Sequence, residues 1–110
     1  MLAVMPCICY NNNEMIESFG DKATEDLFHG HYSARVKHFP NEILDAALRK
    51  MDMLEAAQIL EDLKIPPGNR LEALRSNLKG YFSIRVNAQW RIIFKWYDGA
   101  AYDVSLTDYH

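Results

Sequence analysis

The chain divides into a first half with helically spaced apolar residues and a second half in which apolar and polar residues alternate. Asp21 is a good helix N-cap, so we expect a short helix over residues 22–29, ended by Gly30. From Asn41 onward, apolar residues recur every three or four positions and predict an amphipathic helix. They are Ile43, Leu44, Ala47, Leu48, Met51 and Leu54. We expect residues 56–63 to continue as a second, shorter helix.

The second half predicts an antiparallel sheet. The stretch Ile65-Pro66-Pro67-Gly68-Asn69 is expected to be a loop, because two prolines and a glycine interrupt regular structure. After it the apolar residues alternate with polar ones in four runs: Leu71 and Ala73; Phe82, Ile84 and Val86; Trp90, Ile92, Phe94 and Trp96; Tyr102, Val104 and Leu106. Residues 87–89 form a predicted turn, and Asp98-Gly99 is a strong hairpin signal.

These patterns predict one α+β domain. The helices pack on one face of a four- to five-stranded antiparallel sheet, with residues 15–19 as an N-terminal edge strand. The opposite face of the sheet is expected to carry the residues that alternate with the core: Arg70, Glu72, Tyr81, Ser83, Arg85, Arg91, Ile93, Lys95 and Asp103. Any one arginine on such a face is usually just solvated. Several together predict a concave polar surface that meets phosphates.

The charge distribution supports this interpretation. The chain has a formal net charge of −3, which by itself argues weakly against binding to nucleic acid. Residues 64–96, however, contain seven basic residues and one acidic residue, a net charge of +6, which leaves −9 for the remainder. Such asymmetry indicates a basic surface on an otherwise acidic molecule, and a polyanion would bind there.

Length and composition bound the other possibilities. The 110 residues make one domain, 49% hydrophobic and 25% charged. No apolar run approaches the roughly 20 residues of a membrane-spanning helix, so no membrane association is expected. Cys7 and Cys9 suit neither a disulfide framework nor a metal site, which favours free thiols in a reducing, cytoplasmic setting. We interpret His29, His31 and His38 as surface residues, and we expect no metal and no cofactor.

Residues 1–14 differ from the rest. They contain no Lys or Arg, Pro6 interrupts their apolar stretch, and the run Asn11-Asn12-Asn13 follows. We interpret them as a disordered lead-in that is not part of the native protein, with Met15 as the natural start and residues 15–110 as the domain. A functional N-terminal arm is the alternative.

Three stretches resemble the HigB group of the RelE/ParE toxin superfamily. They are residues 15–19; Asn69-Arg70-Leu71 with Leu74 and residues 80–87; and Trp90-Arg91-Ile92-Ile93-Phe94, with the Asp98-Gly99 turn and the final Asp108-Tyr109-His110. The resemblance spans residues 15–110. It implies a RelE-like, microbial-RNase-like fold and ribosome-dependent cleavage of translated messenger RNA, which inhibits growth. It also implies a HigA-like helix-turn-helix antitoxin as partner, through which alone the toxin would meet operator DNA.

Cleavage without a metal uses the RNA 2′-hydroxyl as nucleophile, so the site must move protons and stabilise the phosphorane. The resemblance directs attention to the C-terminus. His110 is our first candidate for proton transfer, because histidine titrates near neutral pH. Asp108 would orient His110 or accept a proton itself. Tyr109 offers a ring to an unpaired base, or alternatively packs over the sheet edge.

Basic residues are the candidates for binding the RNA backbone. Arg75 stands where the family usually has a basic residue, and we assign it to the scissile phosphate, with Lys79 as a weaker helper. Arg70 belongs to the same basic surface. Arg85 and Arg91 either bind phosphate or form an ion pair with the C-terminal carboxylate. For Arg91 we weigh these two roles equally.

One departure from the family pattern concerns Glu72, where many members carry a histidine. A carboxylate can act as a general base, so we keep Glu72 among the catalytic candidates and expect weak activity. Two alternatives stay open. The chain could inhibit DNA gyrase as ParE-like toxins do, which would make Asp108, Tyr109 and His110 dispensable. It could instead be a catalytically weak toxin that acts mainly as a corepressor of its operon with the antitoxin.

Overall fold

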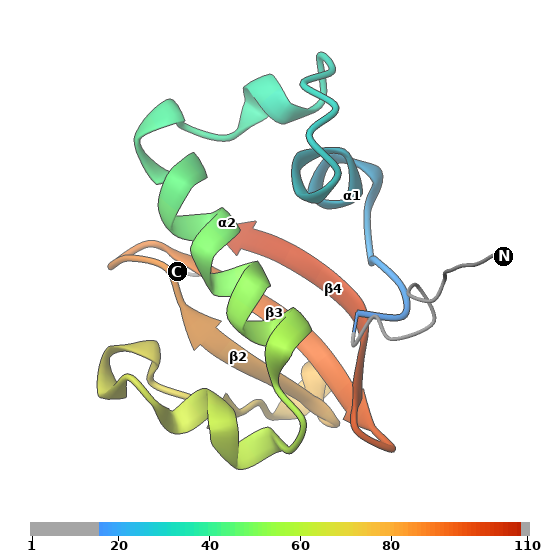
Figure 1. Cartoon of the computed structure of the whole chain (residues 1–110), viewed down its shortest axis with the longest axis vertical. Coiled ribbons are helices and arrows are strands. Elements are labelled where there is room, and N and C mark those ends of the chain that lie inside the picture. Colours follow the sequence, from blue (N-terminus) through green and yellow to red (C-terminus); the bar gives the residue numbers. More distant parts are fainter. Residues whose placement is uncertain (1–15, 109–110) are drawn as a thin grey trace, which may run out of the picture.

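The structure is a computed structural model that describes residues 16–108. The predictions made for residues 1–15, for Tyr109 and for His110 therefore lie outside the described residues. Two helices, α1 and α2, cover one face of a four-stranded antiparallel sheet (Figure 1). The predicted α+β architecture is confirmed.

Helix α1 (Lys22–Phe28) begins and ends where its capping residues predict. The Asp21 carboxylate accepts a hydrogen bond from the Thr24 amide at 2.7 Å, which satisfies one of the free N–H groups of the first turn. Gly30 follows the helix with a φ of 77°, a left-handed conformation that glycine adopts without steric cost. Leu27 is fully buried and attaches the helix to the core.

Helix α2 (Asn41–Ala56) buries the apolar stripe that its spacing predicts. Ile43, Ala47, Met51 and Leu54 are buried in one cluster with the inward residues of the sheet, which are Ile84, Ile92, Phe94, Val104 and Leu106. In Figure 1, α2 runs obliquely across the sheet in front of β3. The helices thereby cover one face of the sheet. The residues that alternate with the core, among them Arg85, Arg91 and Lys95, lie on the other face.

The expected second helix is wrong in its position and type. The chain leaves α2 at Ala56, is extended at Ala57 and Ile59, and forms a 3₁₀ helix only over Leu60–Lys64. The Asp62 carboxylate accepts hydrogen bonds from the amides of Gln58 and Ile59 at 3.0 and 3.3 Å. This local capping competes with continuation of α2, as aspartate side chains often do.

The sheet is a meander of β1 (Glu72–Ala73), β2 (Tyr81–Arg85), β3 (Trp90–Tyr97) and β4 (Ala100–Asp108), in that spatial order. Both predicted turns are present. The Asn87 side chain accepts hydrogen bonds from the Gln89 and Trp90 amides. Asp98 and Gly99 have φ values of 52° and 76°, and a type I′ hairpin requires positive φ at both positions. The expected burial of Ala73 is wrong, because the short edge strand β1 is exposed at both residues.

A β-bulge in β4 changes the alternation. Between the pairs Ile93–Ser105 and Lys95–Tyr102, β4 holds one residue more than β3, and Asp103 adopts a φ of 53°. As a result Ala101 is fully buried, while Tyr102 is only partly buried and stands beside Lys95 on the polar face. The expectation that Tyr102 belongs to the apolar series is therefore wrong, because that series assumed an unbroken period of two.

The N-terminal segment lies along β4, as predicted, but from Ile16 onward it forms two isolated bridges and not a regular edge strand. Ile16 and Phe19 form parallel bridges to Ala101 and Val104. The Glu17 and Gly20 amides donate to the carbonyls of Ala101 and Val104 at 2.7 and 2.8 Å. Within residues 16–108, no helix has the length and apolar character to cross a bilayer.

Candidate nucleic-acid interface

Three arginines meet at one end of the polar sheet face. Arg85 and Arg91 are directly opposite each other on β2 and β3. Arg70 precedes β1, whose pairing of Glu72 with Ser83 brings Arg70 to the same end of the sheet. Together with Asn87 and Ala88 of the following turn, the three arginines line a pocket of about 300 Å³. The alternating pattern predicted that these side chains share a face, and the strand register places them around one pocket.

Arg91 is held by the backbone and by an acid. Its guanidinium donates from Nη2 to the Arg70 carbonyl oxygen at 2.7 Å. Its Nη1 lies 3.7 Å from Oε1 of Glu72, and the Arg91 side chain is only 12% exposed. Glu72 itself is 53% exposed. The pocket thus contains one positioned, largely buried cation, with an accessible carboxylate beside it.

Arg70 occupies a backbone conformation that arginine rarely adopts. Its φ and ψ are 48° and 56°, in the left-handed region, just after the 3₁₀ helix Pro67–Asn69. A non-glycine residue in that region costs of order 1 kcal/mol. The geometry directs the Arg70 carbonyl to Arg91 and leaves the Arg70 side chain lining the pocket.

Asn69 anchors this corner to the helical layer. It is fully buried, and its Nδ2 donates to the Leu63 carbonyl at 3.1 Å. Its Oδ1 accepts a hydrogen bond from Nζ of Lys50 on α2. Burial, and secondly the charge of Arg49, lower the pKa of Lys50. The sequence places Asn69 in the proline loop and in a stretch that resembles the HigB group, but it predicts no anchoring role for this residue.

Asp108 contacts the turn of residues 87–89, part of which lines the pocket. Its backbone pairs with Trp90, the neighbour of Arg91 on β3. Its Oδ2 accepts a hydrogen bond from Nε2 of Gln89 at 3.0 Å. The register brings the end of β4 to the arginine pocket, and it puts Thr107 directly opposite Arg91. Tyr109 and His110 follow next in the chain and lie outside the described residues.

Arg75 and Lys79 lie elsewhere on the sheet. They flank the exposed 3₁₀ helix Ser76–Leu78, in the loop that leads from β1 into Tyr81. Tyr81 is four residues before Arg85 on β2, or about 13 Å at a rise of roughly 3.3 Å per residue. The two basic groups of candidates are therefore at opposite ends of β2, and the assignment of Arg75 to the scissile phosphate stays a prediction.

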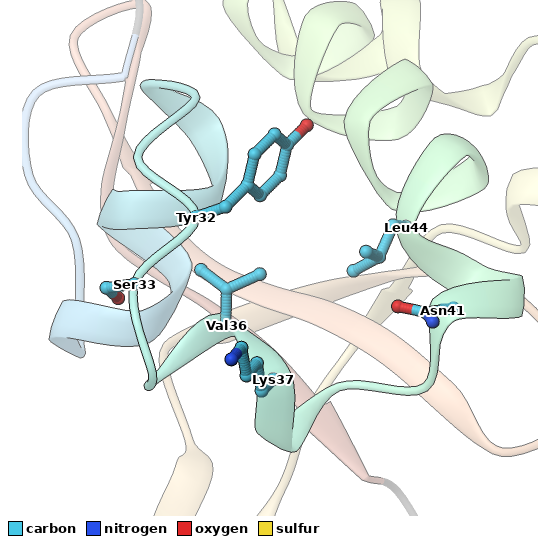
Figure 2. A pocket seen from close by; sticks show the side chains of 6 residues that line it. All are labelled: Tyr32, Ser33, Val36, Lys37, Asn41 and Leu44. Atoms are coloured by element: carbon cyan, nitrogen blue, oxygen red, sulfur yellow. The ribbon is translucent and has the colours of Figure 1, made fainter.

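A second hollow lies on the helical side of the molecule. It has a volume of about 330 Å³ and is lined by Tyr32, Ser33, Val36, Lys37, Asn41 and Leu44. Figure 2 shows these side chains arranged between the linker that follows α1 and the first turns of α2. Among them Lys37 carries the only charge. This lining offers neither an acid–base pair nor a cluster of cations, so the candidate chemistry belongs to the sheet face.

Comparison with known proteins gives the family. Residues 17–110 match the family described as the RelE-like toxin of type II toxin-antitoxin system HigB. Toxin HigB-1 of Vibrio cholerae serotype O1 is 47% identical over 92 residues, which are 84% of this chain and 95% of that protein. Endoribonuclease HigB of Proteus vulgaris is 31% identical over 96 residues, which are 87% of this chain and 100% of that protein.

Among solved structures, the YoeB–YefM complex from Staphylococcus aureus aligns with 86% of this chain and 97% of its own, at 21% identity and a TM-score of 0.49. The sequence matches cover nearly all of the described domain. They are to the HigB family, which the resemblance of the sequence motifs predicted. The chain therefore belongs to the HigB family of RelE-like toxins, the toxin component of type II toxin–antitoxin systems.

Proposed function

We propose that this toxin is an endoribonuclease that cleaves messenger RNA on translating ribosomes, works without a metal, and is neutralised by a HigA-like antitoxin. The observation that carries the proposal is the arginine pocket: Arg70, Arg85 and Arg91 converge beside the end of β4. Like charges directly opposite each other destabilise a sheet. A pocket that brings arginines together accordingly favours an anionic ligand, and RNA phosphates supply that charge.

The proposed chemistry divides proton transfer from charge stabilisation. A base removes the proton from the 2′-hydroxyl, the 2′-oxygen attacks phosphorus, and an acid protonates the leaving 5′-oxygen. His110 is our candidate for proton transfer, with Asp108 as its orienting partner and Tyr109 as a ring for an unpaired base. Guanidinium groups of Arg85 and Arg91 would stabilise the phosphorane, since bidentate hydrogen bonds suit phosphate oxygens.

Glu72 is the second candidate base. Its carboxylate is accessible and lies 3.7 Å from Arg91 Nη1, so a phosphate bound at Arg91 would come within reach of it. We expect Glu72→Gln, which keeps the shape and removes the base, to lower the cleavage rate by about a hundredfold. Glu72→His would restore the residue that many family members carry, and we expect it to cleave at least as fast as the wild type.

Membership of a type II toxin family implies an antitoxin partner, and we propose its identity and the cellular target. An antitoxin is part of every type II system, and the solved YoeB–YefM pair is named as a complex. We propose a HigA-like antitoxin with a helix-turn-helix domain, operator binding only through that antitoxin, the ribosome with its messenger RNA as target, and action in the cytoplasm.

The decisive experiment compares three chains induced in bacteria: wild type, the double variant Asp108→Ala/His110→Ala, and Asp52→Ala. Asp52 is an exposed acid of α2 and serves as the matched control. We expect new messenger RNA 5′ ends inside translated codons with wild type and Asp52→Ala. These ends should be absent from the double variant and from cells in which translation is blocked.

The other outcomes discriminate between functions. Equal growth arrest by wild type and double variant without new 5′ ends would refute the nuclease and make gyrase the next target. If neither version arrests growth while the chain binds its antitoxin tightly, the chain acts as a corepressor, and nuclease activity is refuted.

A further inference from the structure

A second cluster of chemistry lies at the other end of the polar sheet face, away from the arginine pocket. Lys95 on β3 stands directly opposite Tyr81 on β2 and Tyr102 on β4. Its ammonium lies 5.1 Å from the centre of the Tyr81 ring. Lys95, Tyr97, Tyr102 and Asp103 line a wide, open pocket of about 470 Å³. None of these pocket residues belongs to the catalytic set discussed above.

The aromatic rings are available to a ligand. Tyr97, the last residue of β3, is 72% exposed, so little of its ring surface is buried against the protein. Tyr102 is brought to this face by the β-bulge at Asp103. Tyrosine rings on a sheet beside a cation are the means by which many proteins hold single-stranded nucleic acid, because every base has a face to stack.

The polar groups of the pocket form a donor and an acceptor side by side. Nζ of Lys95 lies 3.7 Å from Oδ2 of Asp103, and both side chains are about half exposed. Oδ1 of Asp103 accepts a hydrogen bond from the Ser18 hydroxyl at 3.4 Å. An ionised carboxylate has about four acceptor sites, so Asp103 can still accept from a ligand. A carboxylate repels phosphate, which makes this pocket unsuitable for the RNA backbone but suitable for the edge of a base.

We propose that Lys95, Tyr97, Tyr102 and Asp103 form a base-binding subsite that stacks one unpaired nucleobase and favours a base with an exocyclic amino group. The amino group donates to Asp103, as cytosine N4 does to acidic side chains, and the adjacent ring nitrogen or carbonyl accepts from Lys95. Uracil lacks the amino group and is the disfavoured base. This inference rests on the proposed function, since it names what the same sheet face selects in the RNA strand.

The spacing along the sheet connects the two sites. Lys95 is four residues beyond Arg91 on β3, about 13 Å at roughly 3.3 Å per residue. A strand whose phosphates lie at the arginine pocket can therefore place a base a few nucleotides away in the tyrosine subsite. The loop that carries Arg75 and Lys79 leads directly into Tyr81 and adds positive charge at this end. Ser83 and Ile93, which pair between the two sites on this face, are buried, so the strand would pass over them.

Binding of non-cleavable RNA tests the subsite separately from catalysis. We would measure the fluorescence anisotropy of labelled, fully 2′-O-methylated oligocytidine and oligouridine of about eight nucleotides, titrated with the full chain at low salt. These two pyrimidines differ mainly in their hydrogen-bonding edge. We expect the wild type to bind oligocytidine about tenfold more tightly than oligouridine.

Two variants separate stacking from edge recognition. Tyr97→Leu keeps an apolar side chain but removes the aromatic face, and we expect it to weaken binding of both oligonucleotides about tenfold. Asp103→Gly removes the carboxylate at a position where glycine accepts the positive φ of 53°. We expect it to abolish the preference for cytidine. Tyr32→Leu, which changes a 64% exposed tyrosine on the helical side, is the matched control and should bind like the wild type.

The outcomes distinguish this inference from the proposed function. Wild-type affinity in Tyr97→Leu, or an unchanged cytidine preference in Asp103→Gly, would overturn the subsite. Arg85→Gln should weaken both oligonucleotides equally and leave their ratio unchanged. If Arg85→Gln binds normally while Tyr97→Leu does not, the arginine pocket fails and the subsite stands. Thermal melting of each variant verifies that it is folded before binding is compared.

Discussion

Arg85 and Arg91 face each other as a direct cross-strand pair on β2 and β3, and Arg70 completes a pocket around them. Arg91 is braced by the Arg70 carbonyl and by Glu72, whereas for Arg85 the pairing partner in the sheet is another cation. Two like charges opposite each other cost a sheet roughly 0.2–1 kcal/mol. The repulsion between these two pocket arginines lowers the stability of the free protein, and an anionic ligand in the pocket would relieve it.

Arg85→Gln is therefore expected to make the protein slightly more stable and less active. We expect the free energy of unfolding in urea to rise by a few tenths of a kcal/mol at low salt, because the cross-strand repulsion is removed. The gain should shrink at high salt, where the charges are screened. Cleavage of translated messenger RNA should fall in the same variant. A lower stability than the wild type at low salt would contradict the repulsion argument.

Arg70→Gly tests whether the left-handed backbone at Arg70 is retained for its side chain. Glycine accepts a φ of 48° without steric cost, so we expect the free energy of unfolding to rise by about 1 kcal/mol. RNA cleavage should decrease because one cation of the pocket is lost. The matched control is Asp98→Gly, which relieves the similar φ of 52° in the hairpin turn and should leave cleavage unchanged. Full activity in Arg70→Gly would remove Arg70 from the interface.

Asn69→Ala is expected to destabilise the protein by roughly 1–3 kcal/mol, because it leaves the Leu63 carbonyl and the Lys50 ammonium without the Asn69 side chain as a partner. Urea denaturation measures this loss, and Asn77→Ala, in an exposed loop, is the control. Replacing both partners by apolar residues, Lys50→Met with Asn69→Leu, should recover part of the stability. An Asn69→Ala protein as stable as the wild type would show that the loop before Arg70 is held by other contacts.

Asp26 makes the stability depend on pH in the acidic range. Its carboxylate is buried and accepts a hydrogen bond from the Ser33 hydroxyl at 2.7 Å. This hydrogen bond lowers the pKa of Asp26 below the ordinary 3.8. Burial acts to raise the pKa, and the charges of Lys22 and Arg35 act to lower it. A lowered folded-state pKa contributes stability above the ordinary pKa of the unfolded chain. That contribution is lost as the pH falls through the lower folded-state value.

We therefore expect Asp26→Asn to be less stable than the wild type at neutral pH and to approach it well below pH 3.8. Urea midpoints measured across this range give the comparison. Ser33→Ala, which removes the main cause of the shift, should narrow the same pH-dependent gap. A difference between wild type and Asp26→Asn that does not change with pH would assign the effect to packing instead of ionisation.

The elements that were predicted correctly depend on local signals. Asp21 caps α1 with its own side chain, and Asp98-Gly99 forms its hairpin because both residues accept positive φ. The apolar spacing of α2 and the alternation in β2 and β3 follow from the periodicity of helix and strand. The error at Tyr102 occurs where a distant contact intervenes, whereas the wrong second helix is explained by local capping from Asp62. The backbone amide of Asp103 donates to the Ser18 hydroxyl at 2.9 Å, across 85 positions of sequence, at the bulge that moves Tyr102 to the polar face.

The sequence by itself determined the order of helices and strands, the face on which the basic residues lie and, through its motifs, the family. Short-range sterics and side-chain periodicity act within a few residues, so they can be read along the chain. The tertiary structure alone decided which residues meet: the opposition of Arg85 and Arg91, the anchoring of Arg70 through Asn69 and α2, and the gathering of tyrosines around Lys95. Strand register and the bulge decide these contacts, because a shift of one residue moves a side chain to the other face of the sheet.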